Sequence, residues 1–360
     1  MQGYVARMGA SETINFTGSL NTGDIGSADN VTIAVSGTDK IGFNLVSNPY
    51  PSAIDFASTA SGLTRTNLVP TIWYRSGGTF PTFNWTTDVG ANLGQRYIPA
   101  MQAFWIQVAS GNTTGTLEFS NPTRIHESQS FYKTQSTTNV FRIELSRDSL
   151  IDEAVVSFFQ GAQDDLDSYD SEKMFSPQNN YPQIYTLTSN ASKVIINGFP
   201  ELNGNEERII PLGFLSNISG DFTLQATNIN DFNYDYSVYL EDIQLNVIQN
   251  LRQTNTYTFN SGVVNDTNRF RLHFGNITTN LSSSENTPAI IYAIKDAIYV
   301  NNSSENNGYM ELFDMNGRKL FNQKAIKGLN KIQINVSEGI YLVYFKNDNQ
   351  VVTQKIMIHK

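Results

Sequence analysis

The stretch DMNGRKLFNQKAIKGLNKIQINVSEGIYLVYF (314–345) decides how the end of this chain folds. Its apolar runs, KIQINV and IYLVYF among them, are short, and turn signals such as Asn316-Gly317 and Glu338-Gly339 separate them. Short runs of this kind, bounded by such turns, are typical of antiparallel β-strands. Similar runs lie on either side, at 297–300, 309–313 and 351–358. The sequence therefore predicts a small β-domain over residues 288–360.

Three motifs inside this domain follow one another in a fixed order and end at the last residues of the chain. The first is a DxxGR turn, the second a GxYxV strand and the third a basic final strand. In this order they resemble the C-terminal sorting domain of type IX secretion system cargo proteins. The matching residues, which the resemblance implies are recognised during secretion, are Asp314, Gly317, Arg318, Gly339, Tyr341, Val343, Lys355 and Lys360.

The resemblance has one departure and one alternative. Many members of the family begin with an Asn-Pro motif, whereas this chain has PAIIYAIKDAIYVNN (288–302), which bears on the subtype of the domain. The alternative is an ordinary immunoglobulin-like module, in which the glycines only form tight turns and Tyr341 belongs to the core.

The resemblance also implies a route and a set of partners. The protein would be secreted across the outer membrane, with the type IX translocon and its shuttle β-barrel protein as partners. A cell-surface sortase would then cut near the linker and attach the cargo to surface lipopolysaccharide. Cargo of this kind includes cell-surface adhesins and proteins of gliding motility. Because the stretch MQGYVARMGASETINF (1–16) has neither a basic nor an apolar export segment, we expect an export signal upstream and treat the chain as a C-terminal part of the secreted protein.

Size and composition favour several β-domains. The chain has 360 residues, of which 39% are hydrophobic and only 16% charged, with 17 Tyr and 22 Phe. This balance is typical of β-sandwiches with weakly charged faces. The net charge of −9 argues against a nucleic-acid partner. The absence of cysteine excludes disulfides, thiolate metal sites and cysteine nucleophiles.

We predict an all-β protein of consecutive β-sandwich domains that ends in the small immunoglobulin-like sorting domain. Residues 1–124 form a β-rich module, 125–275 a jelly-roll-like or immunoglobulin-like sandwich, and 276–287 a polar linker rich in Asn, Ser and Thr. In the last strand of the second sandwich, NRFRLHF (268–274), the three apolar side chains alternate with polar ones. We expect His273, on the polar face, to be a surface residue.

The phrase GFNLVSNPYPSAIDF (42–56) is the signature of the first module. Together with YIPAMQAFWIQV (97–108) it resembles a module that precedes sorting domains in large surface proteins of the same bacteria, a module without a catalytic role. We interpret it as a rigid corner that holds a loop against the sheet. Pro49 and Pro51 end the strand, and SAIDF is expected to form a short helical turn with Ser52 as its N-cap.

The acidic loop DDLDSYDSEK (164–173) is the best candidate for a cofactor site. Its carboxylates are the oxygen ligands that Ca²⁺ prefers, although the spacing is not that of an EF-hand. The candidate calcium ligands are Asp164, Asp165, Asp167 and Asp170. We interpret the segment as a solvated loop between strands and predict no cofactor, with a calcium site as the alternative. A glycosidase pair would need a cleft and a fixed separation of the two carboxyl groups.

Other candidate chemistry is sparse. The three histidines, His126, His273 and His359, lie in different segments and fit no zinc or triad pattern. Aromatic side chains gather around SGGTFPTFNW (76–85), either as an exposed glycan-binding or protein-binding surface or as the core of a long hairpin. We therefore predict a non-enzymatic secreted cell-surface protein, and the alternative is an adhesive or carbohydrate-binding sandwich with a surface glycan as its ligand.

Overall fold

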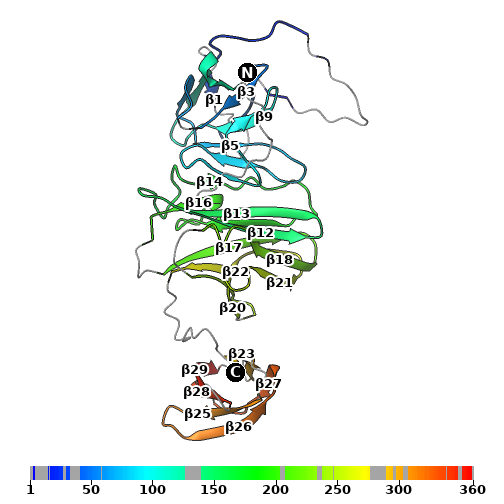
Figure 1. Ribbon diagram of the computed structural model, residues 1–360, viewed down its shortest axis with the longest axis vertical. Coiled ribbons are helices and arrows are strands. Elements are labelled where there is room, and N and C mark those ends of the chain that lie inside the picture. Colours follow the sequence, from blue (N-terminus) through cyan, green and yellow to red (C-terminus); the bar gives the residue numbers. More distant parts are fainter. Residues whose placement is uncertain are drawn as a thin grey trace. The chain divides into compact units, whose positions relative to one another are not determined.

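The structure of the chain is a computed structural model that forms two compact units, Met1–Asn276 and Ile277–Lys360 (Figure 1). It describes residues 3–4, 15, 17–26, 30–32, 41–57, 59–125, 139–202, 207–232, 237–245, 247–275, 289–294, 297–302, 307–337, 339–347 and 351–358. Apart from one 3-10 turn at Asn121–Thr123, the regular elements of these residues are β-strands, so the all-β prediction is confirmed. No helix in these ranges is long and apolar enough to span a membrane.

The first sandwich of the larger unit contains three small sheets. The central sheet has the order β2-β9-β5-β6-β7, and the others are β1-β10-β4 and β11-β3-β8. The strands are β1 (Asn30–Thr32), β2 (Phe43–Ser47), β3 (Ala53–Asp55), β4 (Leu63–Thr66), β5 (Thr71–Trp73), β6 (Thr82–Asn84), β7 (Val89–Ala91), β8 (Tyr97–Ile98), β9 (Ala103–Gln107), β10 (Thr114–Phe119) and β11 (Arg124–Ile125).

The predicted corner after β2 is present, but its second half is a strand and not a helical turn. Asn48 is buried, and its side-chain amide donates to the carbonyl oxygens of Ser52, Ile98 and Pro99 at 2.9–3.0 Å. Its Oδ1 accepts a hydrogen bond from the Tyr50 amide at 2.9 Å. The SAIDF segment forms β3, which pairs with β8 and β11, because these neighbouring strands offer it a sheet ladder. The expected helical turn with Ser52 as N-cap is therefore wrong.

The second sandwich is built from one long sheet that closes around a single core. The strand order is β20-β19-β22-β17-β15-β16-β13-β12-β18-β21, with β14 added beside β16. All neighbouring pairs are antiparallel except β13 and β16. The strands are β12 (Val140–Arg147), β13 (Leu150–Phe158), β14 (Ser171–Glu172), β15 (Gln183–Leu187), β16 (Lys193–Phe199), β17 (Arg208–Ser216), β18 (Gly220–Ala226), β19 (Val238–Asp242), β20 (Val247–Asn250), β21 (Thr256–Ser261) and β22 (Val264–Phe274).

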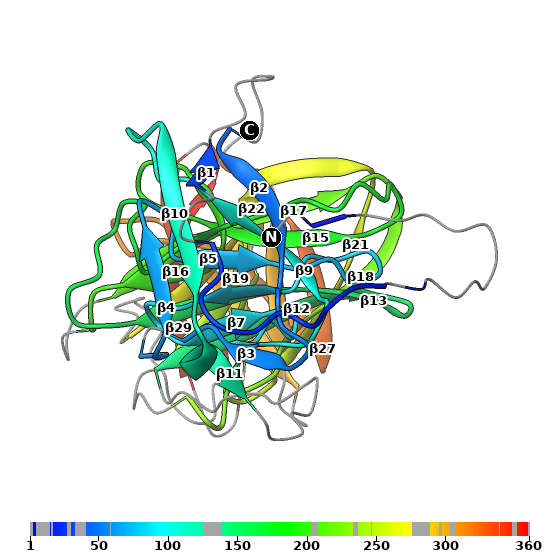
Figure 2. The ribbon, with the colours of Figure 1, turned by 90° about the horizontal axis from the view of Figure 1, so that it is seen from above.

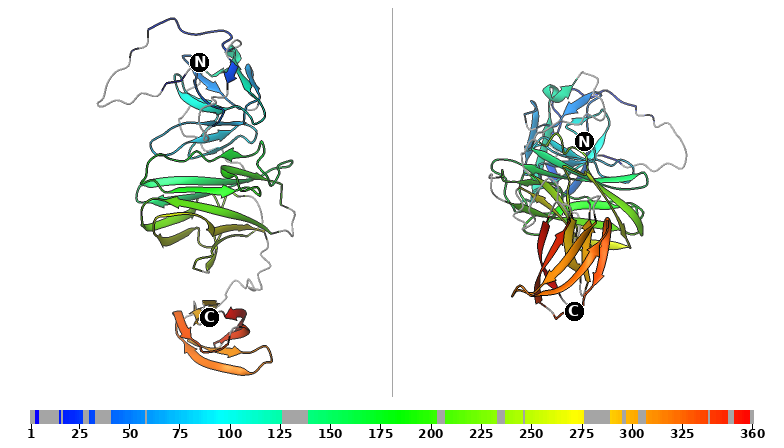
Figure 3. Two further views of the ribbon diagram at one scale, coloured as in Figure 1. Left: turned by 180° about the vertical axis from the view of Figure 1, so that it is seen from behind. Right: turned by 60° about the horizontal axis from the view of Figure 1, so that its bottom comes forward.

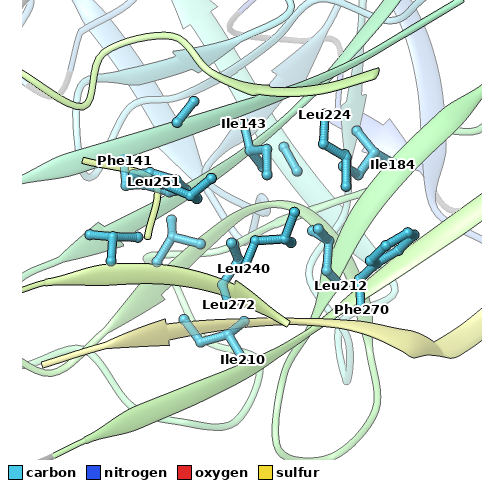
Figure 4. Close-up of a cluster of buried hydrophobic side chains, with 14 of the residues drawn as sticks. Phe141, Ile143, Ile184, Ile210, Leu212, Leu224, Leu240, Leu251, Phe270 and Leu272 are labelled. Carbon is cyan, nitrogen blue, oxygen red and sulfur yellow. The ribbon is translucent and has the colours of Figure 1, made fainter. Parts of the chain in front are cut away.

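The core of this sandwich draws on strands from the whole length of the sheet. Figure 4 shows Phe141 and Ile143 from β12, Ile210 and Leu212 from β17, and Phe270 and Leu272 from β22 gathered in one cluster. The apolar face predicted for β22 is confirmed, because Phe270, Leu272 and Phe274 all lie in this core. Figure 1 and the view from behind in Figure 3 show the two layers, with β12 and β13 above β17 and β22.

The two sandwiches share buried surface and belong to the same compact unit. One apolar cluster combines Val89 and Ala91 of β7 with Val155 of β13 and Ile195 and Ile196 of β16. Seen from above in Figure 2, β5, β7 and β9 of the first sandwich lie over the strands of the second. Strand β13 is thus covered on both faces, which explains why it is buried from Asp152 to Phe158.

The smaller unit is a two-sheet sandwich. One sheet has the order β23-β24-β27 and the other β26-β25-β28-β29. Met310, Val343 and Ile356 are among the side chains in the core between them. The strands are β23 (Ala289–Ile294), β24 (Ala297–Asn302), β25 (Gly308–Phe313), β26 (Lys319–Ala325), β27 (Gly328–Gln333), β28 (Gly339–Lys346) and β29 (Val351–Ile358), and the right-hand view of Figure 3 shows them in orange and red. The predicted linker (276–287) lies outside the described residues.

Candidate functional site

The DxxGR motif forms the turn between β25 and β26, and the Asp314 carboxylate organises it. Asp314 Oδ1 accepts hydrogen bonds from the backbone amides of Asn316 and Arg318, both at 3.0 Å. Its own amide donates to the Arg318 carbonyl at 3.1 Å. The bond from the Arg318 amide is the main cause that lowers the pKa of Asp314 below its usual value. The carboxylate therefore remains charged at neutral pH and fixes the loop.

Two further residues of the motif have separate tasks in this turn. Gly317 has a φ of +79°, in the left-handed region that glycine enters without steric cost. Arg318 donates from Nε to Asp314 Oδ2 at 3.1 Å, yet its side chain remains 77% exposed. The turn therefore holds the base of the arginine and leaves most of the guanidinium accessible to a partner.

The GxYxV motif has a different position, because it is the inner face of strand β28. Tyr341 and Val343 are buried in the core, at 6% and 0% exposure. The Tyr341 hydroxyl donates to the Ser337 carbonyl at 2.7 Å, which ties the segment before β28 to the strand. Gly339 opens the strand and pairs with Ile358. Tyr341 and Val343 thus stabilise the domain from within, and a partner would not touch them directly.

Of the two basic residues predicted near the C-terminus, Lys355 is exposed on the edge strand β29. Lys360 lies outside the described residues. Lys355 pairs with Leu342 of β28, and Leu342 pairs with Phe313 at the end of β25. Lys355 therefore stands in the same row of the sheet as Phe313, the residue that leads into the Asp314 turn.

The acidic loop of the larger unit binds its own backbone and neighbouring side chains. Asp164 forms an ion pair with Arg208, and Asp165 accepts a hydrogen bond from the Ser189 hydroxyl. Asp167 accepts bonds from the amides of Gln163 and Tyr169, at 2.9 and 2.7 Å. Within the described ranges, no group of three or more acidic or histidine side chains is placed to hold a metal ion. The geometry therefore gives no support to the calcium prediction, which stays a prediction.

The fourth residue of that group, Asp170, lies at the junction of the two sandwiches. Its carboxylate accepts the amides of Asp167 and Gly198, both at 2.8 Å, and is 2% exposed. Burial raises its pKa to about 7, against the effect of these two amides. The backbone carbonyl of Asp170 accepts a hydrogen bond from Asn84 of β6 at 2.9 Å. Asp170 thus anchors the loop beneath the first sandwich.

The junction also contains an ion pair that the sequence did not reveal. Lys173 Nζ contacts Asp152 Oδ2 at 2.6 Å, and both side chains are 2% exposed. Asp152 also accepts hydrogen bonds from the Asn92 side chain and the Ile184 amide, each at 2.8 Å. Asn92 comes from the first sandwich, directly after β7. The hydrogen bond from Asn92 to Asp152 therefore ties this ion pair of the second sandwich to the first.

The expectation that His273 is a surface residue is wrong. The side chain is 8% exposed and lies between two glutamates, with Nδ1 2.7 Å from Glu207 Oε1 and Nε2 3.0 Å from Glu241 Oε2. Strand β22 has β17 and β19 as neighbours, and Glu207 precedes β17 while Glu241 belongs to β19. Side chains from the flanking segments thus cover His273, whereas Arg271 on the same face stays exposed. The predictions that concern His126 and His359 fall outside the described residues.

The aromatic group around residues 73–85 is a core and not an exposed platform. The five side chains are between 0% and 8% exposed; they are Trp73, Tyr74, Phe80, Phe83 and Trp85. Trp73 and Phe80 pack with Met174 of the second sandwich, so part of this group belongs to the junction. These rings are not available to stack on a sugar.

Comparison with known protein families agrees with this division of the chain. Residues 294–359 match the family described as the secretion system C-terminal sorting domain. The protein is thus a type IX secretion cargo, exported across the outer membrane through its interaction with that secretion system.

A second match covers residues 1–274 and names the family. The chain belongs to the family described as domain of unknown function DUF8693, whose single model spans both sandwiches. This span agrees with the shared junction, which makes the two sandwiches one unit. No curated protein matches the chain.

Proposed function

We propose that this protein is a secreted cell-surface protein whose sorting unit is recognised by the outer-membrane translocon and its shuttle β-barrel protein. After export, a cell-surface sortase cuts near the linker (276–287) and attaches the remaining chain to the surface. The two sandwiches are then a rigid, non-enzymatic stalk or adhesive element. In this proposal the cargo works by binding and display, as an adhesin or a component of gliding motility, and not by catalysis.

The geometry of the Asp314 turn carries the proposal. A turn that needed only to reverse the chain would not require an arginine, yet Arg318 is held at its base and left 77% exposed. The charged guanidinium has five donors in a planar fork, which suits recognition of a carboxylate or another acceptor on a partner. Edge strand β29 offers a second contact, because an edge strand can extend the sheet of another protein.

The proposed role of the larger unit depends on its rigidity. The junction combines the Asp152–Lys173 pair with two apolar clusters that include side chains of both sandwiches. A stalk needs such a junction, because a loose joint would let the two halves bend independently. The alternative, a carbohydrate-binding sandwich, loses its main candidate surface, since the aromatic group around Trp73 and Trp85 is buried.

A secretion assay tests this proposal. Residues 277–360 have their own core and form a compact unit, so they can be joined to a periplasm-directed fluorescent reporter. The fusion is expressed in a bacterium with an intact type IX system and in a strain without the translocon. We expect the reporter at the surface or in the medium only in the intact strain. Retention in the periplasm of both strains would refute the proposal.

A third strain, which lacks the sortase, separates surface attachment from simple release. In a strain without the sortase, the full chain should be exported but remain uncut and unattached. If the chain reached the cell surface equally well in that strain, the attachment step would be wrong while the export step would stand.

A further inference from the structure

The outer face of the sheet β26-β25-β28-β29 is framed by lysines. The pairing register places its side chains in three rows that run across the strands. The first row is Lys319, Phe313, Leu342 and Lys355; the second is Asn322, Glu311, Tyr344 and Thr353; the third is Lys324, Tyr309, Lys346 and Val351. The intervening residues, Leu312 and Val343 for example, point into the core. This alternation defines the face on three strands and most of β26. A register shift opposite Phe313 interrupts it on β26, where the ion pair with Glu311 places Lys319 on the same face.

The centre of the face is aromatic. Phe313 and Tyr344 meet edge to face, with ring centroids 5.0 Å apart. Tyr309 and Val351 are 56% and 57% exposed. Aromatic side chains with an accessible ring and hydroxyl are frequent at protein interfaces, because they supply apolar area and a hydrogen bond together. The middle of the face is therefore suited to contact with a protein.

The rim of the face is positive. Lys319, Lys324, Lys346 and Lys355 are exposed, and Glu311 is the acidic residue among the twelve positions. Glu311 is already paired with Lys319 at 2.5 Å. For the other three lysines, no ion pair is found among the described residues. This surplus contrasts with the chain as a whole, whose net charge is −9.

The area of this outer face limits how strongly a partner can bind to it. Strands are about 4.8 Å apart and rise about 3.3 Å per residue, so three strand spacings and four residues span roughly 14 by 13 Å. The resulting footprint, roughly 200 Å², is well below the ~800 Å² per partner of stable complexes. A contact of this size and charge favours fast binding and fast release, which suits a sorting unit that binds its partner only transiently during export.

We propose that this lysine-framed face docks on an acidic protein surface of the export machinery, one with carboxylates around an apolar patch. The inference rests on the proposed function and adds a second recognition surface to the Asp314 turn. The turn and the face are adjoining parts of one structure, since Phe313 precedes Asp314 and Lys319 follows Arg318. Charge complementarity selects the partner. A partner surface edged by carboxylates is attracted to the four lysines, and a partner surface edged by basic residues is repelled.

The test reverses charge on the face within the whole stretch of residues 1–360, directed to the periplasm by an added export signal. The variant Lys324→Glu with Lys346→Glu is compared with a matched control, Lys327→Glu with Lys331→Glu, which changes the net charge equally. Lys331 lies on β27, in the other sheet. We expect the face variant to be exported about tenfold more slowly than the wild type, because like charges oppose each other across the contact. The control should change the rate less than about twofold, and the unfolding midpoints of the face variant and the wild type should agree.

Two results would overturn the inference. One is equal export of the face variant and its control. The other is binding of the full-length wild-type chain, but not of the face variant, to vesicles of phosphatidylglycerol, because the face would then dock on an anionic membrane. Failure of the wild-type chain to be exported is a separate result, which would refute the proposed function itself.

Discussion

In the larger unit several basic side chains are turned into the protein, whereas in the sorting unit the basic side chains face outward. Lys173 and Arg269 are 2% and 4% exposed and pair with buried Asp152 and Asp242. Arg318 and Lys319 of the sorting unit are 77% and 48% exposed. The same residue types therefore serve two purposes: in Met1–Asn276 they build the fold, and in Ile277–Lys360 they remain accessible to a partner.

The net charges of the two units differ as well, and the sorting unit is the more basic of the two. Residues 277–360 contain nine Lys and Arg against seven Asp and Glu, a net charge of +2. Since the whole chain has a net charge of −9, the larger unit has −11. Positive charge is thus concentrated where the export signal lies, which teaches that the charge of a secreted protein is best assessed unit by unit.

The largest effect is expected from breaking the buried pair of the larger unit. Asp152→Ala leaves the Lys173 ammonium buried without its partner and should lower the free energy of unfolding by about 3–5 kcal/mol. Urea unfolding of the purified chain measures this loss. The control is Glu311→Ala in the sorting unit, whose exposed pair with Lys319 should contribute less than about 1 kcal/mol. Equal losses for the two variants would remove the contrast between the units.

The stability of the larger unit should also depend on pH, because the carboxyl group of Asp170 is buried. Its pKa is about 7 in the folded chain and 3.8 in a model compound, so the folded state binds the proton more tightly. Stability should therefore fall as pH rises from about 4 to 7, by an amount on the order of 3 kcal/mol from this group.

The variant Asp170→Asn isolates this contribution. The difference in unfolding free energy between the wild type and the variant should fall across that pH range and become constant above about pH 8. A difference that does not change between pH 4 and 7 would contradict the raised pKa.

A smaller loss of stability is expected from a change at the corner of the first sandwich. Asn48→Ala removes a side chain that forms hydrogen bonds with four backbone groups and leaves some of them buried without a partner. We expect a cost of about 2–3 kcal/mol in thermal or urea unfolding. Asn44→Ala serves as the control, because the Asn44 amide bonds to the nearby Gly42 carbonyl. A loss no larger than that of the control would mean that the corner is not a rigid element.

Alternation along single strands predicted much of this architecture. The pattern of β22 placed Phe270, Leu272 and Phe274 in the core, and the motifs of the C-terminal strands identified the sorting domain. The same pattern failed for His273, because alternation assigns a side chain to a face and does not say whether another element covers that face. The helical turn expected at SAIDF failed for a related reason, since pairing with β8 and β11 overrode the local signal.

The junction of the two sandwiches was not predicted, although one signal for it exists in the sequence. The run DEAVVSFF (152–159) has no clear alternation, which is typical of a strand buried on both faces. In the structure, one face of β13 meets the core of its own sandwich and the other meets β7. Which segment covers the second face depends on distant pairing, and the residues of β13 do not reveal it.

The most direct test of the contrast between the units is a crossed measurement on Arg269→Met and Arg318→Met, in which stability and export are both recorded for each full-length variant. We predict that Arg269→Met lowers the free energy of unfolding by about 3 kcal/mol or more, because Asp242 loses its buried partner. We predict that Arg318→Met changes stability by less than about 1 kcal/mol and sharply reduces export. If instead Arg318→Met were exported at the wild-type rate, the exposed cations of the sorting unit would not be the recognition element, and the proposed contrast between the two units would not hold.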